Sequence, residues 1–254
     1  MASRKTQGTS DQVEGRNPVL EALRGPREVH EIYLADAADR SDEICEIIQL
    51  AAATGVPVKD ASRQRIDSMA RTSAPQGVIA KVAPYRYLDL GEMLELVAST
   101  DDALLLALDG VEDPQNLGAL LRVADAAGVN AVVITGRHSA GITPAVTKAS
   151  AGAVEHVTVA QVSSLPAALE RLKSAGLWIA GAESEGGMPY YEMDMTVPMV
   201  LVLGGEGKGL GRLTKERCDR LLSLPMSGGV SSLNVATAGA AILFEVVRQR
   251  VTRA

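Results

Sequence analysis

Aromatic residues are scarce in this 254-residue chain, at 3% of the sequence with one Trp and one Phe. A ligand site built on a large aromatic stacking platform is therefore not expected. Long hydrophobic runs are also missing. The longest largely apolar stretch, 238–247, is far shorter than the roughly 18 residues that a membrane span needs, so no membrane association is predicted. Residues 1–11 contain no apolar segment of the signal-peptide kind and predict a flexible tail.

Cysteine and histidine are too few and too scattered for a structural cross-link or a metal centre. The two cysteines, Cys45 and Cys218, lie far apart, and the three histidines show no zinc-ligand spacing. The sequence therefore predicts no disulfide framework and no bound metal. This cysteine usage favours a cytoplasmic protein.

Basic residues are not in excess, since the net charge is −6. This balance excludes a surface coated in positive charge, but it does not exclude nucleic-acid binding through a local patch. One candidate is the segment 208–220, in which five cations stand against two acids. A solvated helix face and a phosphate-binding patch explain this segment equally well.

Residues 12–84 alternate between helical and extended patterns and predict a small α/β domain. Ser41 and Gly55 are typical of the two ends of one helix. The expected helices cover 17–25, 41–55 and 62–71, and the expected strands cover 28–35, 56–60 and 76–84. Residues 85–95 read as a linker, although a helix could begin around Leu94 and Val97, and 96–254 read as a second α/β domain.

The second domain contains continuous apolar runs, such as ALLLALDGV at 103–111 and PMVLVLGG at 198–205. Such runs indicate strands that are buried on both faces. Further strands are expected at 131–135, 154–160, 177–182 and 220–226, with helices at 117–127, 144–153, 165–176 and 233–250. This alternation predicts a parallel sheet covered by helices on both faces, with ligands bound beyond the carboxyl ends of its strands.

Polar residues follow three of these segments. In LDGVEDPQNLGALLRVADAAGV (108–129), Asn116 could cap the next helix and Arg122 lies almost two turns further on. In LVLGGEGKGLG (201–211), five glycines surround Glu206, yet neither the Walker A motif nor the dinucleotide fingerprint is satisfied. In PMSGGVSSLNVATAGAAILFE (225–245), Ser231 or Ser232 could cap the last helix. Each block also has a plain structural interpretation, as a cap with a surface arginine, a glycine turn or a helix cap.

Taken in order, the three blocks DPQNLGALLRVADAAGV, LVLGGEGKGL and LPMSGGVSSLNVATAGAAILFE resemble the SpoU, or TrmH-type, family of RNA 2′-O-ribose methyltransferases. GRNPVLEAL and QGVIAKV resemble the L30e-like RNA-binding domain of the subgroup that modifies 23S ribosomal RNA. One departure is Pro75, which precedes Gln76-Gly77 where family members often have His. The resemblance implies an α/β fold whose C-terminal part, roughly 200–243, forms a deep trefoil knot. It also implies a homodimer with the active site at or near the interface.

The resemblance implies S-adenosylmethionine as cofactor and an RNA ribose 2′-hydroxyl as methyl acceptor. The catalytic positions that it implies are Asn116, Arg122, Glu206, Ser232 and Asn234. The cofactor-binding positions that it implies are Leu203, Gly204, Gly205, Gly207, Leu224, Met226, Ser232 and Leu233. The family proposal makes the arginine the proton acceptor. A guanidinium remains protonated in proteins, so we expect Arg122 to stabilise the developing alkoxide instead.

Other targets remain open within this resemblance, namely a tRNA ribose or a resistance-type methylation of ribosomal RNA. The N-terminal domain favours ribosomal RNA. A non-catalytic RNA-binding or ribosome-assembly protein is the alternative outside the enzymes, and the presence of all five catalytic positions argues against it.

Overall fold

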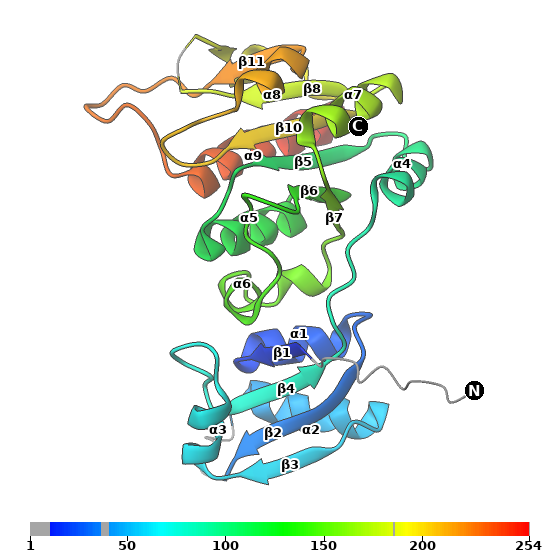
Figure 1. Ribbon diagram of the computed structural model, residues 1–254, viewed down its shortest axis with the longest axis vertical. Helices are drawn as coiled ribbons and strands as arrows, with labels where there is room; N and C mark the ends of the chain where they lie inside the picture. Colours follow the sequence, from blue (N-terminus) through cyan, green and yellow to red (C-terminus); the bar gives the residue numbers. More distant parts are fainter. Residues whose placement is uncertain (1–10, 37–40, 185, 254) are drawn as a thin grey trace. The chain divides into compact units, whose positions relative to one another are not determined.

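The computed structural model describes residues 11–36, 41–184 and 186–253, which form two compact units (Figure 1). The first unit contains the chain up to Arg86 together with Ile142–His156, and the second contains Tyr87–Gly141 and the chain from Val157 onward. The predicted tail lies outside the described residues except for Asp11. The predicted domain boundaries at 84 and 95 stay predictions.

The first unit is built on a four-stranded sheet in the order β1-β4-β2-β3, in which β2 pairs parallel with β3 and antiparallel with β4. The strands are β1 (Asp11–Glu14), β2 (Val29–Ala35), β3 (Val58–Ala61) and β4 (Val78–Val82). The helices are α1 (Arg16–Arg24), α2 (Asp42–Thr54) and α3 (Arg63–Met69), joined by α6 (Pro144–Ala149) and the short 3-10 helix η1 (Ala153–Glu155). The three helices and three strands expected in this region are confirmed within a few residues.

Strand β1 was not expected, because the segment DQVE has only one apolar residue. Three of its four residues are nevertheless buried, and Glu14 is fully buried. The Glu14 carboxylate accepts hydrogen bonds from the backbone N–H groups of Arg71 (2.6 Å) and Thr72 (3.0 Å). A buried carboxylate satisfied by distant backbone donors leaves no hydrophobic pattern in the sequence.

The second unit contains a seven-stranded, wholly parallel sheet in the order β7-β6-β5-β10-β8-β11-β9. Its strands are β5 (Leu104–Asp109), β6 (Ala131–Thr135), β7 (Val159–Val162), β8 (Trp178–Ala182), β9 (Met188–Pro189), β10 (Met199–Gly204) and β11 (Arg220–Ser223). Its helices are α4 (Leu90–Ala98), α5 (Pro114–Ala126), α7 (Leu165–Ser174), α8 (Arg212–Arg217) and α9 (Val235–Arg253), with the 3-10 helix η2 (Tyr190–Glu192). The parallel α/β architecture expected from the sequence is confirmed.

Helices cover both faces of this sheet. Leu105 and Ala107 of β5 pack in one core with apolar residues of α4 and α7. Because side chains alternate along a strand, Leu104 and Leu106 point to the other face and are fully buried there too. On that face α9 lies against β10 and α5, so closely that a Cβ at Gly239 would be 2.7 Å from the Leu203 side chain.

Two local expectations were wrong, and one short strand was missed. Helix α4 begins at Leu90, inside the predicted linker, where Asp89 and Glu92 form a capping box. The strand expected at 154–160 begins only at Val159, because its first residues form η1. Strand β9 was not expected, since two residues carry no periodic signal.

Within the described residues, no helix has the length and apolarity needed to cross a bilayer.

Candidate functional site

The candidate site lies at the carboxyl ends of β5 and β10. The two strands are in register up to their last residues, where Gly204 pairs with Asp109. The loops that leave these strands carry two of the three sequence blocks to one edge of the sheet. The third block reaches the same edge because α9 packs beside β10 on one face of the sheet.

Gly204 at the end of β10 and Gly205 directly after it must be glycines, because backbone segments cross closely there. A Cβ at Gly204 would lie 2.2 Å from the carbonyl carbon of Gly209, and one at Gly205 would lie 2.1 Å from the carbonyl oxygen of Gly110. Gly207 and Gly209 have φ of 76° and 61°, a region that favours glycine. The loop 204–209 therefore folds back on itself and on the loop after β5, and only glycine fits at the two crossings.

Three of the predicted catalytic residues meet in one hydrogen-bonded group. The side-chain amide of Asn234 donates to Oδ1 of Asn116 (2.8 Å) and to Oε1 of Glu206 (2.8 Å). These residues come from the start of α9, from α5 and from the loop after β10. The three sequence blocks are thus joined by side-chain contacts at a single point.

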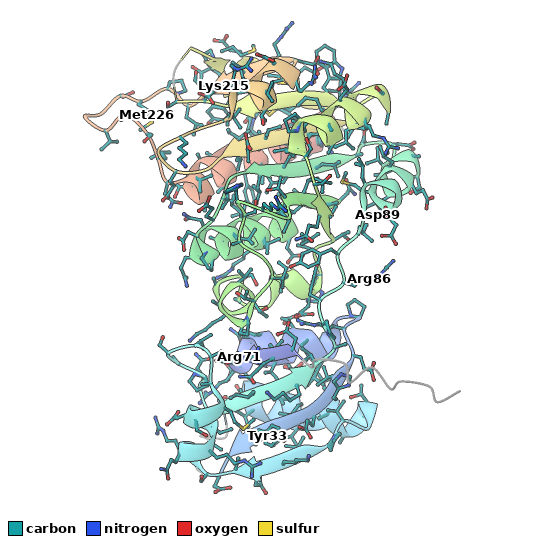
Figure 2. The ribbon with its side chains drawn as sticks, in the orientation of Figure 1. Tyr33, Arg71, Arg86, Asp89, Lys215 and Met226 are labelled. Carbon is teal, nitrogen blue, oxygen red and sulfur yellow. The ribbon has the colours of Figure 1, made fainter. Side chains whose placement is uncertain are left out.

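A cavity of about 460 Å³ lies beside this group. Its lining includes all eight predicted cofactor-binding residues: Leu203, Gly204, Gly205, Gly207, Leu224, Met226, Ser232 and Leu233. Figure 2 shows Met226 on the loop that follows β11. The volume is in the range of small-molecule sites, and the lining combines apolar side chains with the backbone of the glycine loop. These features fit a nucleoside with an amino-acid chain.

A second cavity of about 440 Å³ is lined by the loop after β5, by Asn116 and by the loop after β10. Among the described residues, Glu206 is the one carboxylate that lines both cavities. It is exposed in each of them. Its position would allow it to contact one molecule in the first cavity and another in the second.

Arg122 is not brought to this group. It is exposed on α5 and lines neither cavity. Six helical residues separate it from Asn116, a rotation that directs its side chain about 120° away from that of Asn116. The spacing in the sequence predicts that Arg122 lies almost two turns after Asn116 on one helix, but the two side chains do not point to the same side of that helix.

Both helix caps predicted within the three sequence blocks were wrong. The cap of α5 is Asp113, whose side chain accepts from the N–H of Gln115 at 3.1 Å, and Asn116 is buried within the first turn. The cap of α9 is Asn234, whose Oδ1 accepts from the N–H of Ala236 at 2.9 Å. Ser231 and Ser232 instead line the first cavity. One side chain, Asn234, therefore both caps a helix and links two site residues.

Gly228 and Gly229 belong to the third sequence block and lie between β11 and α9. A Cβ at either position would meet no atom within 4 Å, and neither has a positive φ. Packing within the described chain therefore does not require glycine there, unlike at Gly204 and Gly205.

Glu183, which was not predicted as a site residue, follows β8 and lines the first cavity. Its carboxylate accepts from the N–H of Leu210 (3.0 Å) and from Nζ of Lys215 (2.8 Å). Figure 2 shows Lys215 on α8. Glu183 thus ties the end of the glycine loop to β8 and α8. In the sequence, the one feature that points to Glu183 is its position as an acidic residue directly after a predicted strand.

The cationic segment 208–220 is largely paired. Lys215 forms an ion pair with Glu183, and Arg212 forms one with Glu216 at 2.5 Å. A guanidinium nitrogen of Arg217 lies 3.5 Å from a carboxylate oxygen of Glu170. This pairing favours the helix-face interpretation for α8, while Lys208 lines both cavities. Among the described residues, no group of three or more His, Cys, Asp or Glu is placed to hold a metal ion.

Comparison with known proteins gives matches over nearly the whole chain. The SpoU rRNA Methylase family matches residues 103–244, and the RNA 2′-O ribose methyltransferase substrate binding family matches residues 12–88. The chain is 44% identical over 229 residues to the 23S rRNA (guanosine-2′-O-)-methyltransferase RlmB of Pseudomonas putida, which covers 89% of this chain and 90% of that protein. It is 39% identical to the putative TrmH family tRNA/rRNA methyltransferase YacO of Bacillus subtilis, over 94% of this chain and 96% of that protein.

A solved structure supports the same relationship. The SpoU methyltransferase AviRb from Streptomyces viridochromogenes, in complex with AdoMet, superposes with a TM-score of 0.79. The two sequences are 26% identical, and the match covers 99% of this chain and 95% of that chain.

Proposed function

Because the chain belongs to the SpoU rRNA methylase family, we propose that it transfers a methyl group from S-adenosylmethionine to the ribose 2′-hydroxyl of a guanosine in 23S ribosomal RNA. One observation carries this proposal. Asn116, Glu206 and Asn234 form a hydrogen-bonded group beside a cavity, and every residue predicted to bind the cofactor lines that cavity. Relatives named for 23S guanosine methylation, at 42% to 44% identity, support the choice of substrate. Such a substrate would place the protein in the cytoplasm.

The first cavity is the proposed cofactor site. Leu203, Leu224, Met226 and Leu233 would contact the apolar faces of S-adenosylmethionine, and the backbone of the glycine loop would bond its polar edges. When bound, the cofactor supplies a sulfonium-activated methyl group. The protein must then hold the ribose oxygen in line with that methyl group and assist the loss of the hydroxyl proton.

Glu206 and Asn116 are placed to orient the ribose, since both line the second cavity. Asn234 fixes their positions through its two hydrogen bonds, and Ser232 lies on the cofactor side. We assign the carboxylate of Glu206 to hydrogen bonding with the reacting hydroxyl or with a cationic partner. A carboxylate that accepts a hydrogen bond from the hydroxyl proton also assists the loss of that proton.

The proposed role of Arg122 is to stabilise the developing alkoxide and to orient an adjacent phosphate. Because Arg122 lies outside both cavities, this role requires bound RNA or a second copy of the chain to complete the site. The test is Arg122→Lys, which keeps the charge but loses the planar fork. Near-full turnover with an unchanged pH profile would leave no specific role for the guanidinium.

A homodimer is proposed through the exposed side of α9. Phe244 and Val251 are 49% and 70% exposed there, and their spacing of seven residues puts them on one helix face. Helix α9 packs beside α5, which carries Arg122. Sedimentation of the wild type as a dimer and of Phe244→Glu as a monomer would support this interface. A monomeric wild type would contradict it.

A trefoil knot over roughly 200–243 is also proposed. Strand β10 lies between β5 and β8, and the chain after β11 returns to the face of β10, where Gly239 of α9 packs against Leu203. Pulling the chain from both termini tests it. A knotted chain would reach a shorter final length than an unknotted chain of 254 residues.

The deciding experiment offers labelled S-adenosylmethionine with a 23S rRNA transcript and, separately, with total tRNA. Label in the transcript, mapped to a guanosine 2′-oxygen, is the expected result. Label in tRNA alone would select the tRNA alternative. Absence of label in any RNA, including ribosomal particles, would favour a non-catalytic RNA-binding protein.

A further inference from the structure

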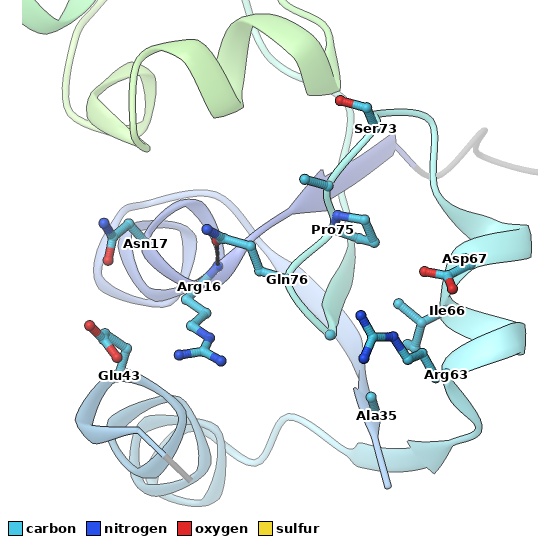
Figure 3. A pocket seen from close by; sticks show the side chains of 12 residues that line it. Arg16, Asn17, Ala35, Glu43, Arg63, Ile66, Asp67, Ser73, Pro75 and Gln76 are labelled. Atoms are coloured by element: carbon cyan, nitrogen blue, oxygen red, sulfur yellow. Dashed lines mark hydrogen bonds between the residues drawn. The ribbon is translucent and has the colours of Figure 1, made fainter. Parts of the chain in front are cut away.

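The first unit contains a cavity of about 610 Å³ that the methyl-transfer site does not use. It lies between the start of α1, the end of β2, the start of α2, helix α3 and the loop 73–77. Figure 3 shows the guanidinium groups of Arg16 and Arg63 directed into it from α1 and α3. A volume of this size is enough for one nucleotide.

Arg16 carries an unsatisfied donor in this cavity. Its Nε atom is buried and has no hydrogen-bond partner within the part of the chain that the structure describes. A buried guanidinium nitrogen without a partner is rare in folded proteins and calls for an acceptor. A molecule bound in this cavity would supply that acceptor.

The loop 73–77, which forms one wall of the cavity, is held in place by hydrogen bonds within the protein. Gln76 has a φ of 53°, unusual for a residue other than glycine, and its Oε1 accepts from the N–H of Arg16 at 3.0 Å. The buried carboxylate of Glu14 holds the N–H groups of Arg71 and Thr72, where this loop begins. Strained backbone that is held in place by its surroundings is typical of binding sites.

The lining has both signs of charge and an apolar part. Glu43 and Asp67 face the same space as the two arginines, while Ala35, Ile66 and Pro75 supply apolar surface. A simple anion would not need carboxylates nearby. An RNA nucleotide offers acceptors to the arginines, base N–H donors to the carboxylates and a base face to the apolar side chains.

We propose that this cavity binds one unstacked nucleotide of the RNA substrate, separate from the nucleotide that is methylated. The proposal rests on the proposed function, because it takes RNA to be the substrate. Arg16 and Arg63 bind phosphate or base acceptor atoms, and the loop 73–77 forms the wall. Pro75 belongs to that wall and is buried.

The chain offers a matched pair of variants on α3. Arg63 lines the cavity, whereas Arg65 does not and instead lies 5.5 Å from the ring of Tyr33. Both are exposed arginines of one helix, so Arg63→Gln and Arg65→Gln remove the same charge from the same element. A difference in RNA affinity between the two variants therefore reports the contribution of the cavity, because the change in net charge is the same in both.

The test measures binding of the full-length protein to a 23S rRNA transcript without cofactor, over a range of salt concentrations. Arg63→Gln is expected to weaken binding by about tenfold and to lower the salt slope by about one, while Arg65→Gln weakens it by less than about threefold. Ala74→Trp, which narrows the cavity at an exposed position without changing charge, is expected to weaken binding by about tenfold as well. Unchanged thermal unfolding shows that the variants are folded.

Equal losses in Arg63→Gln and Arg65→Gln, or wild-type affinity in Ala74→Trp, would overturn the cavity proposal. Methyl transfer by the wild type is measured separately. Arg63-dependent binding without any methyl transfer would count against the proposed function alone. Methyl transfer with equal losses in the two arginine variants would count against the cavity alone.

Discussion

The side-chain amide of Asn234 donates a hydrogen bond of 2.8 Å to Oδ1 of Asn116, joining residues 118 positions apart. Its Oδ1 caps α9 at the same time by accepting from the N–H of Ala236. Asn234 is thus the point at which the last helix is tied to the first sequence block. Its two functions can be separated by substitution.

Asn234→Asp should keep the helix cap and lose the two donated hydrogen bonds, because Asp caps helices as well as Asn. We expect the rate of methyl transfer to fall between about tenfold and a hundredfold, because the variant loses two hydrogen bonds that contribute about 1 kcal/mol each. Asn234→Ala should show the same loss and a further loss of about 1 kcal/mol in the free energy of unfolding. Single-turnover rates and thermal unfolding check both, and full activity in Asn234→Asp would show that the donated bonds do not matter.

Gly204→Val should abolish cofactor binding. Its Cβ would lie 2.2 Å from the carbonyl carbon of Gly209, so the glycine loop has to move. Gly228→Ala is the control, because a Cβ there meets no atom within 4 Å. Calorimetry should detect no S-adenosylmethionine binding in the first variant and wild-type affinity in the second. Unchanged affinity in Gly204→Val would mean that the loop does not form the cofactor site.

Glu183 is predicted to be a positioning residue for the glycine loop. Glu183→Ala loses both the bond to the Leu210 N–H and the ion pair with Lys215, whereas Glu183→Gln keeps an acceptor for the N–H. We expect KM for the cofactor to rise about tenfold in the first and less in the second, with kcat little changed. Glu216→Gln, which breaks an exposed pair on α8, is the control. Equal kinetics in all three variants would remove this role.

The two cysteines should differ sharply in reactivity. Burial raises the pKa of the Cys218 thiol to about 11, so almost no thiolate is present at neutral pH, whereas Cys45 is exposed. Native protein treated with iodoacetamide at pH 7.5 should therefore be alkylated first at Cys45, and Cys218 should react only on unfolding. Peptide mapping over time measures both rates. Equal rates would show that the region around Cys218 opens readily.

Local pattern determined most of the helices and strands. Continuous apolar runs identified β5 and β10 because a strand buried on both faces has no polar alternation. The three sequence blocks contain the eight residues predicted to bind the cofactor, and all eight line the first cavity, but so do residues outside the blocks such as Glu183. The blocks come together because loops at the carboxyl ends of parallel strands meet at one edge. Resemblance, and not spacing, supplied the roles of those residues.

Tertiary structure alone decided the contacts between distant residues. Glu14 makes β1 a buried strand by bonding N–H groups 57 and 58 residues away, and Glu183 holds a loop 27 residues further on. The path by which the chain enters α9 made Asn234 the cap in place of either serine. A hydrogen bond between distant residues depends on where the whole sheet places them, and no periodicity in the sequence records that placement.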